Sequence, residues 1–331
     1  DHEHILCAMG PMGQVTRILA YKLHSYLTYV SPEETEGNIP AIGHIDPVTL
    51  NDVYRFRALS DRTALYAVTG WPLAKTSSPA LHNEGYKINN IDALLFPLRS
   101  PSVSDVLDCA ASLGVRGLAV TVPHKEAVIP ELIKLDSEAQ AIGACNTVVR
   151  TDEGWTGCNT DAYGFQTALL RFLGVKKLRH RRVAVIGAGG AAKAVAYVVQ
   201  SLGAKACIFN RTLSHAKALA ERYGFDYAPL GPEAAKKIEK YADIIIQTTS
   251  KGMNSDGQAS KDGDPLYFYQ FNGTETVFDL VYVPAVTPIM ARASEAGCKT
   301  CNGAEMLKYQ GYKQFKIFTG IDYGADCERL C

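Results

Sequence analysis

A lysine follows a strand-like stretch of the chain, in the segment AVTVPHKE at residues 119–126. β-Branched residues run up to Pro123, and Lys125 comes two residues later, so a strand could aim its ammonium group at a fixed point. A lysine held there by a carboxylate could donate a proton to an oxygen that gains negative charge. The other interpretation of a single lysine is a solvated surface charge.

Two further segments offer the polar groups that such a site needs. GACNTVV at 143–149 contains Asn146, and GCNTDAYG at 157–164 contains Asn159 and Asp161. Two Asn-Thr pairs in turn-like settings indicate polar groups arranged around a hydroxylated ligand. Taken singly, each of these residues is more typical of a helix cap or a turn.

A glycine-rich turn, GAGGAA at 187–192, follows an apolar strand and opens a helix. In this context G-x-G-x-x-G/A is typical of dinucleotide binding. Gly187 permits the tight turn, Gly189 lets the backbone approach a pyrophosphate, and Ala192 lets the helix pack on the sheet. Backbone N–H groups and the helix dipole then favour the phosphates. The alternative, a tight turn without a ligand, fits this context less well.

The end of the following strand indicates which dinucleotide binds. NAD sites place an acidic residue there, which bonds the ribose 2′-hydroxyl. Here the strand ends in Asn210, Arg211 and Thr212, so no carboxylate repels a 2′-phosphate and an arginine can pair with it. The sequence therefore predicts NADP as the cofactor.

Composition restricts the class of protein. The 331 residues suit two or three domains. Lys+Arg and Asp+Glu are both 34, which argues against a nucleic-acid or anionic-membrane partner, and no apolar run approaches the length of a membrane span.

Nine scattered cysteines are typical of reduced thiols. We therefore expect a cytoplasmic protein, or a plastid protein if the source is a plant, although no transit peptide is visible. We interpret the single CxxC at 298–301 as coincidence and expect no metal site.

Strand and helix patterns alternate along most of the chain. Strands at 64–70, 93–99 and 117–123 alternate with helices at 77–90 and 103–114, which predicts an α/β domain with mostly parallel strands. A second such domain is predicted from the βαβ pattern at 181–212 and from buried strands at 242–250 and 275–282. Residues 303–320 are predicted to form an amphipathic helix.

The first 60 residues contain two strand–helix units. Strands are predicted at 4–10 and 26–31, and helices at 13–23 and 46–59, the second with Asp46 as its N-cap and Pro47 in its first turn. Two units cannot close a sheet or bury both of its faces. We therefore expect this segment to be the tail of a domain whose front lies upstream.

Taken together, residues 64–321 closely resemble the shikimate dehydrogenase family. The matching segments stand in family order: GWPLAKTSSPALHN, VTVPHKE, GACNTVV, GCNTDAYG, GAGGAAKA, NRT, TTSKGM, DLVYVPAVTP and GAEMLKYQ. The N-terminal segment resembles the end of a type I dehydroquinate dehydratase, through MGQVTRIL and YLTY. PHKE and GAEML…Q…FTG are similar to the plant-like branch in which these two enzymes are fused.

This resemblance implies the fold and the domains. We expect an α/β protein in which a three-layer α/β substrate domain and a Rossmann NADP-binding domain follow the last two β-α units of a (β/α)8 barrel. The implied bounds are 1–60 for the barrel remnant, 61–165 for the shikimate-binding catalytic domain, joined by helix 303–320, and 166–302 for the Rossmann domain. The dehydratase's Schiff-base lysine would lie upstream of residue 1. We therefore expect the upstream barrel in the same polypeptide, and no dehydratase activity from this chain alone.

The resemblance also implies a reaction and the residues that perform it. The reaction is the reversible NADPH-dependent reduction of 3-dehydroshikimate to shikimate, in the pathway to chorismate and the aromatic amino acids. Lys125 and Asp161 would form the catalytic dyad. The implied substrate-binding residues are Thr76, Ser78, Thr121, Asn146, Tyr282 and Gln310. Those implied to bind the cofactor are Gly187, Ala188, Gly189, Gly190, Ala191, Asn210, Arg211, Thr212, Thr248, Ser250, Gly252 and Met253.

The chain departs from the family pattern at several positions. Thr76 replaces a serine, which keeps the hydroxyl and adds a methyl group to the pocket. Ala119 stands where asparagine or serine is usual, so one substrate hydrogen bond is in doubt. In the dehydratase-like segment Arg17 matches a substrate arginine, whereas AIGH at 41–44 replaces APGQ and puts His44 in place of a glutamine.

Two alternatives remain open. The substrate could be quinate, although the retained Ser78 and the larger Thr76 tighten the corner that would take quinate's extra hydroxyl. Some fungal repressors of quinate use resemble these domains without being catalytic, so a sensing module is the second alternative. Lys125, Asp161 and the intact glycine-rich turn favour an enzyme.

Overall fold

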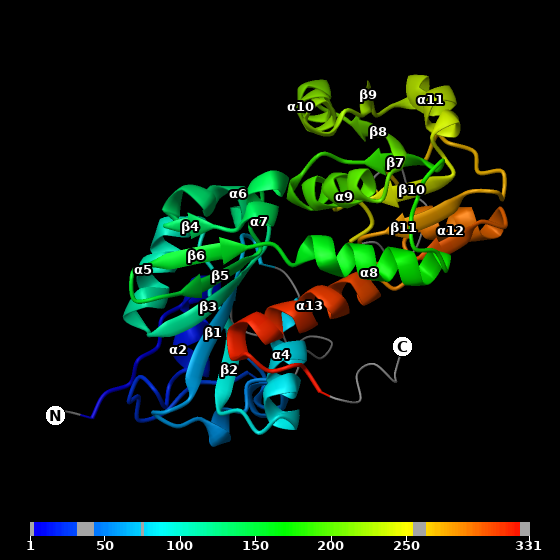
Figure 1. Ribbon diagram of the computed structural model, residues 1–331. Helices are drawn as coiled ribbons and strands as arrows, with labels where there is room; N and C mark the ends of the chain where they lie inside the picture. Colours follow the sequence, from blue (N-terminus) through cyan, green and yellow to red (C-terminus); the bar gives the residue numbers. More distant parts are fainter. Residues whose placement is uncertain (1–2, 32–42, 74–75, 254–262, 325–331) are drawn as a thin grey trace. The chain divides into compact units, whose positions relative to one another are not determined.

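The computed structural model describes residues 3–31, 43–73, 76–253 and 263–324, and Figure 1 shows the order of their helices and strands. The chain divides into two compact units. Unit 1 comprises Asp1–Ala139, Cys145–Cys158 and Gly311–Cys331, and unit 2 comprises Gln140–Ala144 and Asn159–Gln310. The predicted remnant at 1–60 falls within unit 1, and its separate domain boundary remains a proposal.

The N-terminal segment differs from its prediction. It forms α1 (Gly10–Gly13), α2 (Val15–Ile18), α3 (Pro47–Asp52) and the 3-10 turn η1 (Phe56–Ala58). The strands predicted at 4–10 and 26–31 are wrong, because the described residues there pair only in an isolated bridge between His4 and Ser25. A strand needs neighbours along its whole length to satisfy its N–H and C=O groups. Of the single helix predicted at 13–23, the α-helix α2 covers only Val15–Ile18, and a separate helix, α1, ends at Gly13.

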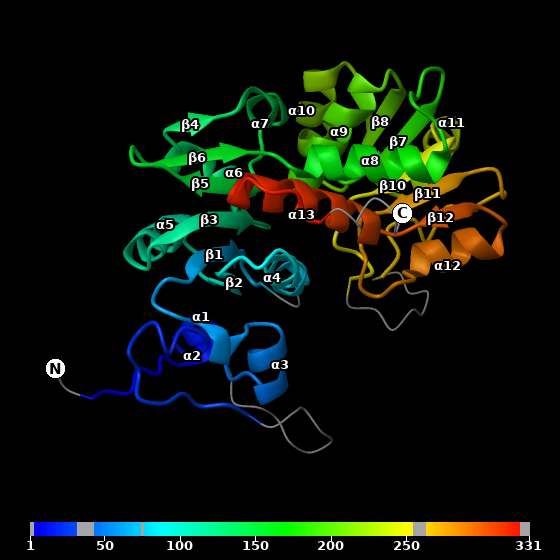
Figure 2. The same cartoon turned by 60° about the horizontal axis from the view of Figure 1, so that its bottom comes forward.

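The cap predicted for α3 is confirmed, since Asp46 Oδ1 accepts from Thr49 N at 2.8 Å. Figure 2 shows α1, α2 and α3 gathered beside one another in unit 1. Ile18 and Leu50 from this segment are buried in the same apolar cluster as Leu65 and Leu94 of the first sheet. The segment is therefore held by hydrophobic burial and not by strand pairing.

Unit 1 contains a six-stranded sheet in the order β2-β1-β3-β5-β6-β4. The strands predicted first are confirmed as β1 (Ala64–Thr69), β2 (Ala93–Pro97) and β3 (Val115–Val120), which pair in parallel. The others were not predicted: β4 (Lys134–Leu135), β5 (Thr147–Arg150) and β6 (Trp155–Cys158). Strand β5 pairs antiparallel with both β3 and β6, so the sheet is mixed. The two Asn-Thr segments flank this hairpin.

Both faces of the first sheet are covered. Side chains alternate along β1, so Leu65 and Ala67 join one apolar cluster and Tyr66 and Val68 join another. The first cluster includes α5 (Val103–Ser112) and the N-terminal segment; the second includes α4 (Ser78–Ile88) and the end of α13 (Ala304–Thr319). The remaining elements are α6 (His124–Ala127), η2 (Ile129–Glu131) and α7 (Ser137–Ile142). Unit 1 thus has the three layers that were predicted.

Unit 2 contains a second six-stranded sheet, parallel throughout, in the order β12-β11-β10-β7-β8-β9. Its strands are β7 (Arg182–Ile186), β8 (Lys205–Asn210), β9 (Asp226–Pro229), β10 (Ile244–Gln247), β11 (Thr276–Asp279) and β12 (Lys299–Cys301). Its helices are α8 (Asp161–Leu173), α9 (Gly190–Ser201), α10 (Leu213–Tyr223), η3 (Pro232–Ala234), α11 (Ala235–Lys240) and α12 (Pro288–Glu295). This order is that of a dinucleotide-binding sheet.

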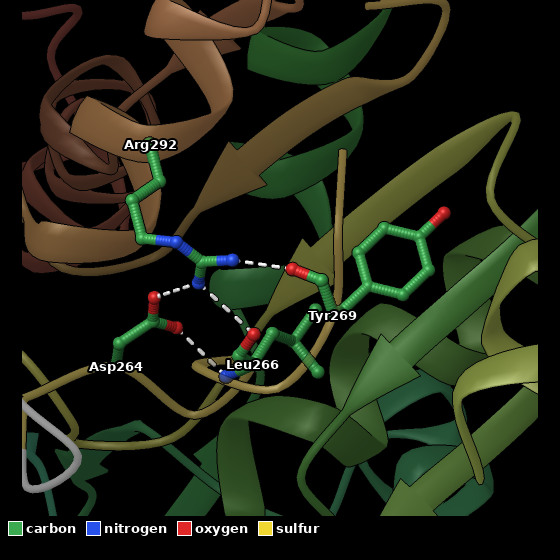
Figure 3. A network of polar contacts seen from close by, with 4 residues as sticks. All are labelled: Asp264, Leu266, Tyr269 and Arg292. Atoms are coloured by element: carbon green, nitrogen blue, oxygen red, sulfur yellow. Dashed lines mark hydrogen bonds and ion pairs between the residues drawn. The ribbon is translucent and has the colours of Figure 1, made fainter. Parts of the chain in front are cut away.

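An ion pair between a partly exposed arginine and a buried carboxylate fixes the connection between β10 and β11. The Arg292 guanidinium on α12 bonds the carboxylate of Asp264, which is 1% exposed, and also the carbonyls of Leu266 and Tyr269 (Figure 3). The other carboxylate oxygen of Asp264 accepts from Leu266 N at 2.7 Å. The segment is thereby tied to α12, with both charged groups hydrogen-bonded as burial requires.

Among the residues that the structure describes, no helix has both the length and the apolar character needed to cross a membrane.

Candidate functional site

In unit 1 the predicted residues gather at the carboxyl ends of β1 and β3. The chain passes from β1 to β2 on one side and returns to β3 on the other, so these two strands flank the point where strand order reverses. Ligands of open α/β sheets bind at such a point. Thr76 and Ser78 follow β1, and Thr121 and Lys125 follow β3. The two loops touch, since Trp71 N donates to Val122 O at 3.1 Å.

The neighbours of Lys125 fix its backbone. Lys125 lies in the short helix α6, which follows β3, and its carbonyl accepts from Cys145 N at 2.8 Å. The preceding residue, His124, is 2% exposed and donates from Nε2 to the Ser100 carbonyl at 2.8 Å. The segments that follow β2 and β3 and the segment that precedes the antiparallel strand β5 thus meet at Lys125 and its neighbour, which fixes the backbone from which the lysine extends.

A buried amide network supports Asn146. The Gln314 side chain donates from Nε2 to the Asn146 carbonyl at 3.2 Å and to Thr147 Oγ1 at 2.8 Å, and Thr147 Oγ1 donates to Asn146 Oδ1 at 3.0 Å. The Oε1 of Gln314 accepts from His82 Nε2 at 3.1 Å. Burial lowers the pKa of the His82 imidazole to about 4, although the bond with Gln314 opposes that shift. The histidine therefore stays neutral at pH 7.

The corner predicted for the substrate carboxylate contains two hydroxyls in contact. Thr76 Oγ1 lies 3.3 Å from Ser78 Oγ and also 3.3 Å from Ser78 N, at the beginning of α4. Ala119 is 5% exposed and packs with Tyr66 and Phe315 in an apolar cluster. A polar side chain would be buried in that cluster, which explains why alanine is accommodated there.

In unit 2 the glycine-rich turn follows β7, beside the point where strand order reverses between β7 and β10. Gly187 has a φ of +113°, and a Cβ there would lie 2.4 Å from Thr248 Oγ1 after β10. Gly189 is different, because a Cβ there would meet no atom within 4 Å. Ala192 is fully buried, as predicted for close packing of α9 on the sheet.

This turn fits a dinucleotide. Since protein packing does not exclude a Cβ at Gly189, the bare backbone there leaves open the space that a pyrophosphate would fill. The N–H groups of Gly190 and Ala191 begin the 12-residue helix α9, whose dipole favours an anion. At the end of β8, Arg211 and Thr212 are exposed, and Asn210 Nδ2 donates to the Thr212 carbonyl at 2.9 Å. The Arg211 and Thr212 side chains are therefore accessible from solvent at the end of β8.

The residues predicted to flank the nicotinamide form the segment after β10. Thr248 is bonded to the Ile186 carbonyl through both its N–H and its hydroxyl, at 2.9 and 2.7 Å. Met253 N donates to Ser250 O at 3.2 Å, and Met253 is 44% exposed. Gly252 has a φ of +87°, a conformation that favours glycine. Tyr282 follows β11, the next strand of the sheet, and is partly exposed.

Asp161 and Gln310, predicted to act on the substrate, belong to unit 2. Asp161 is the first residue of α8 and is 5% exposed. Asn159 Oδ1 accepts from Ala162 N at 3.2 Å, so Asn159 acts locally as a cap of this helix. Thr160 Oγ1 donates to Gln310 Oε1 at 3.3 Å, which links α8 to α13. The two members of the predicted dyad thus come from different units.

Within the described ranges, no group of three or more His, Cys, Asp or Glu side chains is placed to hold a metal ion. Of the CxxC pair, Cys298 donates to Glu275 Oε2 at 3.3 Å, and burial raises its pKa to about 11. That thiol is accordingly a poor nucleophile at pH 7.

Sequence reasoning missed several side chains that support these residues. Gln314 and His82 lie within helical patterns, and Gln247 and Asp279 lie at the ends of apolar strands. Their only signal is a polar residue at a position that the pattern predicts to be buried.

The chain is similar to known proteins over most of its length. The family described as "Shikimate dehydrogenase substrate binding domain" matches residues 68–148, and the family described as "Shikimate / quinate 5-dehydrogenase" matches residues 171–255. A shikimate dehydrogenase (NADP(+)) from Thermococcus kodakarensis is 38% identical over 78% of this chain and 92% of its own length.

A bifunctional 3-dehydroquinate dehydratase/shikimate dehydrogenase from Arabidopsis thaliana is 33% identical over 95% of this chain. The match spans 53% of that relative, so the chain corresponds to about half of it. Among solved structures, the shikimate 5-dehydrogenase of Thermus thermophilus in complex with NADP(H) and shikimate has a TM-score of 0.67 and is 33% identical. It matches over 78% of this chain and 94% of its own. On this evidence, the chain belongs to the shikimate dehydrogenase family.

Proposed function

We propose that this chain reduces 3-dehydroshikimate to shikimate with NADPH, reversibly, in the pathway that supplies aromatic amino-acid precursors. One observation carries the proposal. In each of the two sheets, the candidate site residues follow the two strands between which the strand order reverses. Polar side chains follow β1 and β3 in unit 1, and a glycine-rich turn and Thr248 follow β7 and β10 in unit 2.

Bound NADPH supplies the hydride for the ketone carbon. The Lys125 ammonium donates a proton to the carbonyl oxygen, so that the C=O bond becomes C–OH and lysine is left neutral until solvent reprotonates it. Asp161 is the second member of the proposed dyad, the carboxylate that acts with Lys125 in proton transfer. Asn146 and Thr121 bond ring hydroxyls with Gln310, while Thr76, Ser78 and Tyr282 bind the carboxylate end.

The cofactor residues divide by the group that they bind. Backbone N–H groups from Gly187 to Ala191 hold the pyrophosphate, and Asn210, Arg211 and Thr212 hold the 2′-phosphate. The segment that contains Thr248, Ser250, Gly252 and Met253 flanks the nicotinamide. An assay of NADPH absorbance with 3-dehydroshikimate tests the function: we expect turnover with NADPH and much weaker turnover with NADH. No turnover with either cofactor would favour a non-catalytic sensing module.

We also propose that a dehydratase barrel precedes this chain in the same polypeptide, in the cytoplasm or in a plastid. The N-terminal segment supports this, because it leaves large apolar side chains exposed that a barrel would cover, among them Ile5, Met9, Met12, Tyr26 and Tyr29. This chain alone should not convert 3-dehydroquinate, since the imine-forming lysine lies outside it. Detectable conversion by the purified chain would contradict that expectation.

A further inference from the structure

A buried glutamine ends β10, immediately before the segment proposed to flank the nicotinamide. Gln247 is 0% exposed. Its Oε1 accepts from Thr249 N at 2.5 Å, and its Nε2 donates to the carbonyls of Thr249 and Lys251, both at 3.1 Å. The side-chain amide thus satisfies backbone groups that the sheet no longer pairs once β10 has ended.

The same glutamine is bonded to the end of the neighbouring strand. Gln247 and Asp279 are paired in register as the last residues of β10 and β11. Gln247 Nε2 lies 3.3 Å from Asp279 Oδ1, and Leu280 N donates to the Gln247 carbonyl at 2.9 Å. Asp279 is itself 0% exposed.

Asp279 in turn organises the segment that leads to Tyr282. Its Oδ1 also accepts from Val281 N at 2.9 Å, and its Oδ2 accepts from Thr287 Oγ1 at 2.6 Å. Burial raises the pKa of this carboxyl to about 6, and the charge of Asp264 contributes in the same direction. The ionised form still predominates at pH 7, where it can accept from all three donors.

Close packing limits any other arrangement of the nicotinamide segment. A Cβ at Gly252 would lie 3.2 Å from Thr287 Cβ, and one at Gly187 would lie 2.4 Å from Thr248 Oγ1. Thr287 therefore contacts both Asp279 and the far end of the segment. Gln247 bonds this segment directly, and Asp279 is linked to it through Gln247 and Thr287.

We infer that Gln247 and Asp279 are positioning residues that hold segment 248–253 and segment 280–282 in one shared arrangement. This inference rests on the proposed function for its catalytic consequence. The first segment flanks the nicotinamide, and the second carries Tyr282 at the substrate carboxylate. Loss of the amide would loosen both together and would reduce hydride transfer more than cofactor affinity, because the phosphates are held elsewhere, by the glycine-rich turn and Arg211.

The test compares three variants with the wild-type chain. Gln247→Met removes the amide and keeps the volume, Asp279→Asn keeps the shape and removes one acceptor, and Glu275→Gln is the control. Glu275 is also a buried carboxyl of unit 2, but it bonds Tyr269 Oη and Asn272 N instead of either segment.

Kinetics provide the first result. We expect Gln247→Met to lower kcat about 10- to 100-fold, as small misplacements of reacting groups do. Asp279→Asn should lower it by a smaller factor, and Glu275→Gln should not. The isotope effect on kcat with deuterated NADPH should rise in the first two variants as hydride transfer becomes limiting, a change that general loss of stability would not cause.

Amide hydrogen exchange provides a second result that needs no activity. Exchange should accelerate in both 248–253 and 280–282 in Gln247→Met and in Asp279→Asn, and in neither segment in Glu275→Gln. If Gln247→Met does not fold, the exchange measured in Asp279→Asn tests the inference. Wild-type kinetics with unchanged exchange, or acceleration in only one segment, would overturn the inference. If the wild-type chain were inactive but exchange still accelerated in both segments of the two variants, the proposed function would be contradicted. The positioning role of Gln247 and Asp279 would still stand.

Discussion

The two sheets place their candidate residues at equivalent positions but use different chemical groups. After β1 and β3 the groups are side chains: Thr76, Ser78, Thr121 and Lys125. After β7 the group is the backbone itself, since Gly187 has a φ of +113° and Gly189 leaves open space. Proton transfer needs a titratable side chain at a fixed point, whereas a pyrophosphate is bound well by bare N–H groups at the beginning of a helix.

This difference predicts that mutations in the two units change different kinetic and binding properties. Side-chain changes in unit 1 should affect turnover and substrate choice, and changes at the end of β8 in unit 2 should affect cofactor affinity and choice.

The largest effect is expected for Lys125→Ala. Removing the general acid should lower kcat by roughly 10²–10⁴-fold while the Kd for NADPH, measured by fluorescence titration, stays nearly unchanged. Lys87→Ala is the matched control, because Lys87 is an exposed lysine of unit 1 paired with Glu84 at 3.7 Å. A Lys125→Ala enzyme within a few-fold of wild type would remove Lys125 from the mechanism.

The second prediction concerns pH and the buried histidine of unit 1. Because the His82 pKa falls from 6.5 to about 4 in the folded chain, the unfolded state binds a proton first as pH drops. The free energy of unfolding should therefore be highest above pH 6.5 and fall by about 3 kcal/mol between pH 6.5 and 4. Denaturant titrations of wild type and His82→Gln measure this, with exposed His180→Gln in unit 2 as the control. An equal acid loss in the His82 variant would show that another group is responsible.

The third prediction concerns the cofactor. Arg211→Ala should cost on the order of 1.5–3 kcal/mol of NADPH affinity, because it removes a charged partner of the 2′-phosphate, and should change NADH affinity little. Lys217→Ala, a neighbouring exposed cation on α10, should change neither. Equal weakening of both cofactors in Arg211→Ala would refute the assigned role of Arg211.

The smallest effect is expected at the substrate corner. Quinate carries an extra hydroxyl beside its carboxylate, and burying that hydroxyl without a partner costs about 1–3 kcal/mol. The wild-type kcat/KM with NADP⁺ should therefore be higher for shikimate than for quinate. Ser78→Gly should narrow the gap by opening the corner. A wild-type kcat/KM for quinate that equals or exceeds the kcat/KM for shikimate would contradict this prediction.

The parts of the fold that the sequence predicts well are those set by local pattern. The βαβ unit at 182–210 and the cap at Asp46 follow from apolar periodicity, turn glycines and hydrogen-bonding side chains close in sequence. The predicted strands at 4–10 and 26–31 failed because strand formation depends on distant neighbours. The hairpin of β5 and β6 was missed because its strands have four residues each, too few to show a period.

The candidate site divides in the same way. Lys125, Asp161 and the glycine-rich turn belong to motifs with a recognisable chemistry. Gln314 supports Asn146 across a separation of 168 residues, and Gln247 contacts Asp279 across 32. Such contacts depend on packing between elements, so no local pattern indicates them.

The most direct measurement follows the hydride. The purified chain would be incubated with 3-dehydroshikimate and NADPH deuterated at both C4 positions, and the product would be analysed by mass spectrometry and NMR. We expect shikimate that carries a single deuterium on the carbon of the newly formed hydroxyl, and little product when deuterated NADH replaces NADPH. Unchanged 3-dehydroshikimate, or shikimate without deuterium, would contradict this expectation.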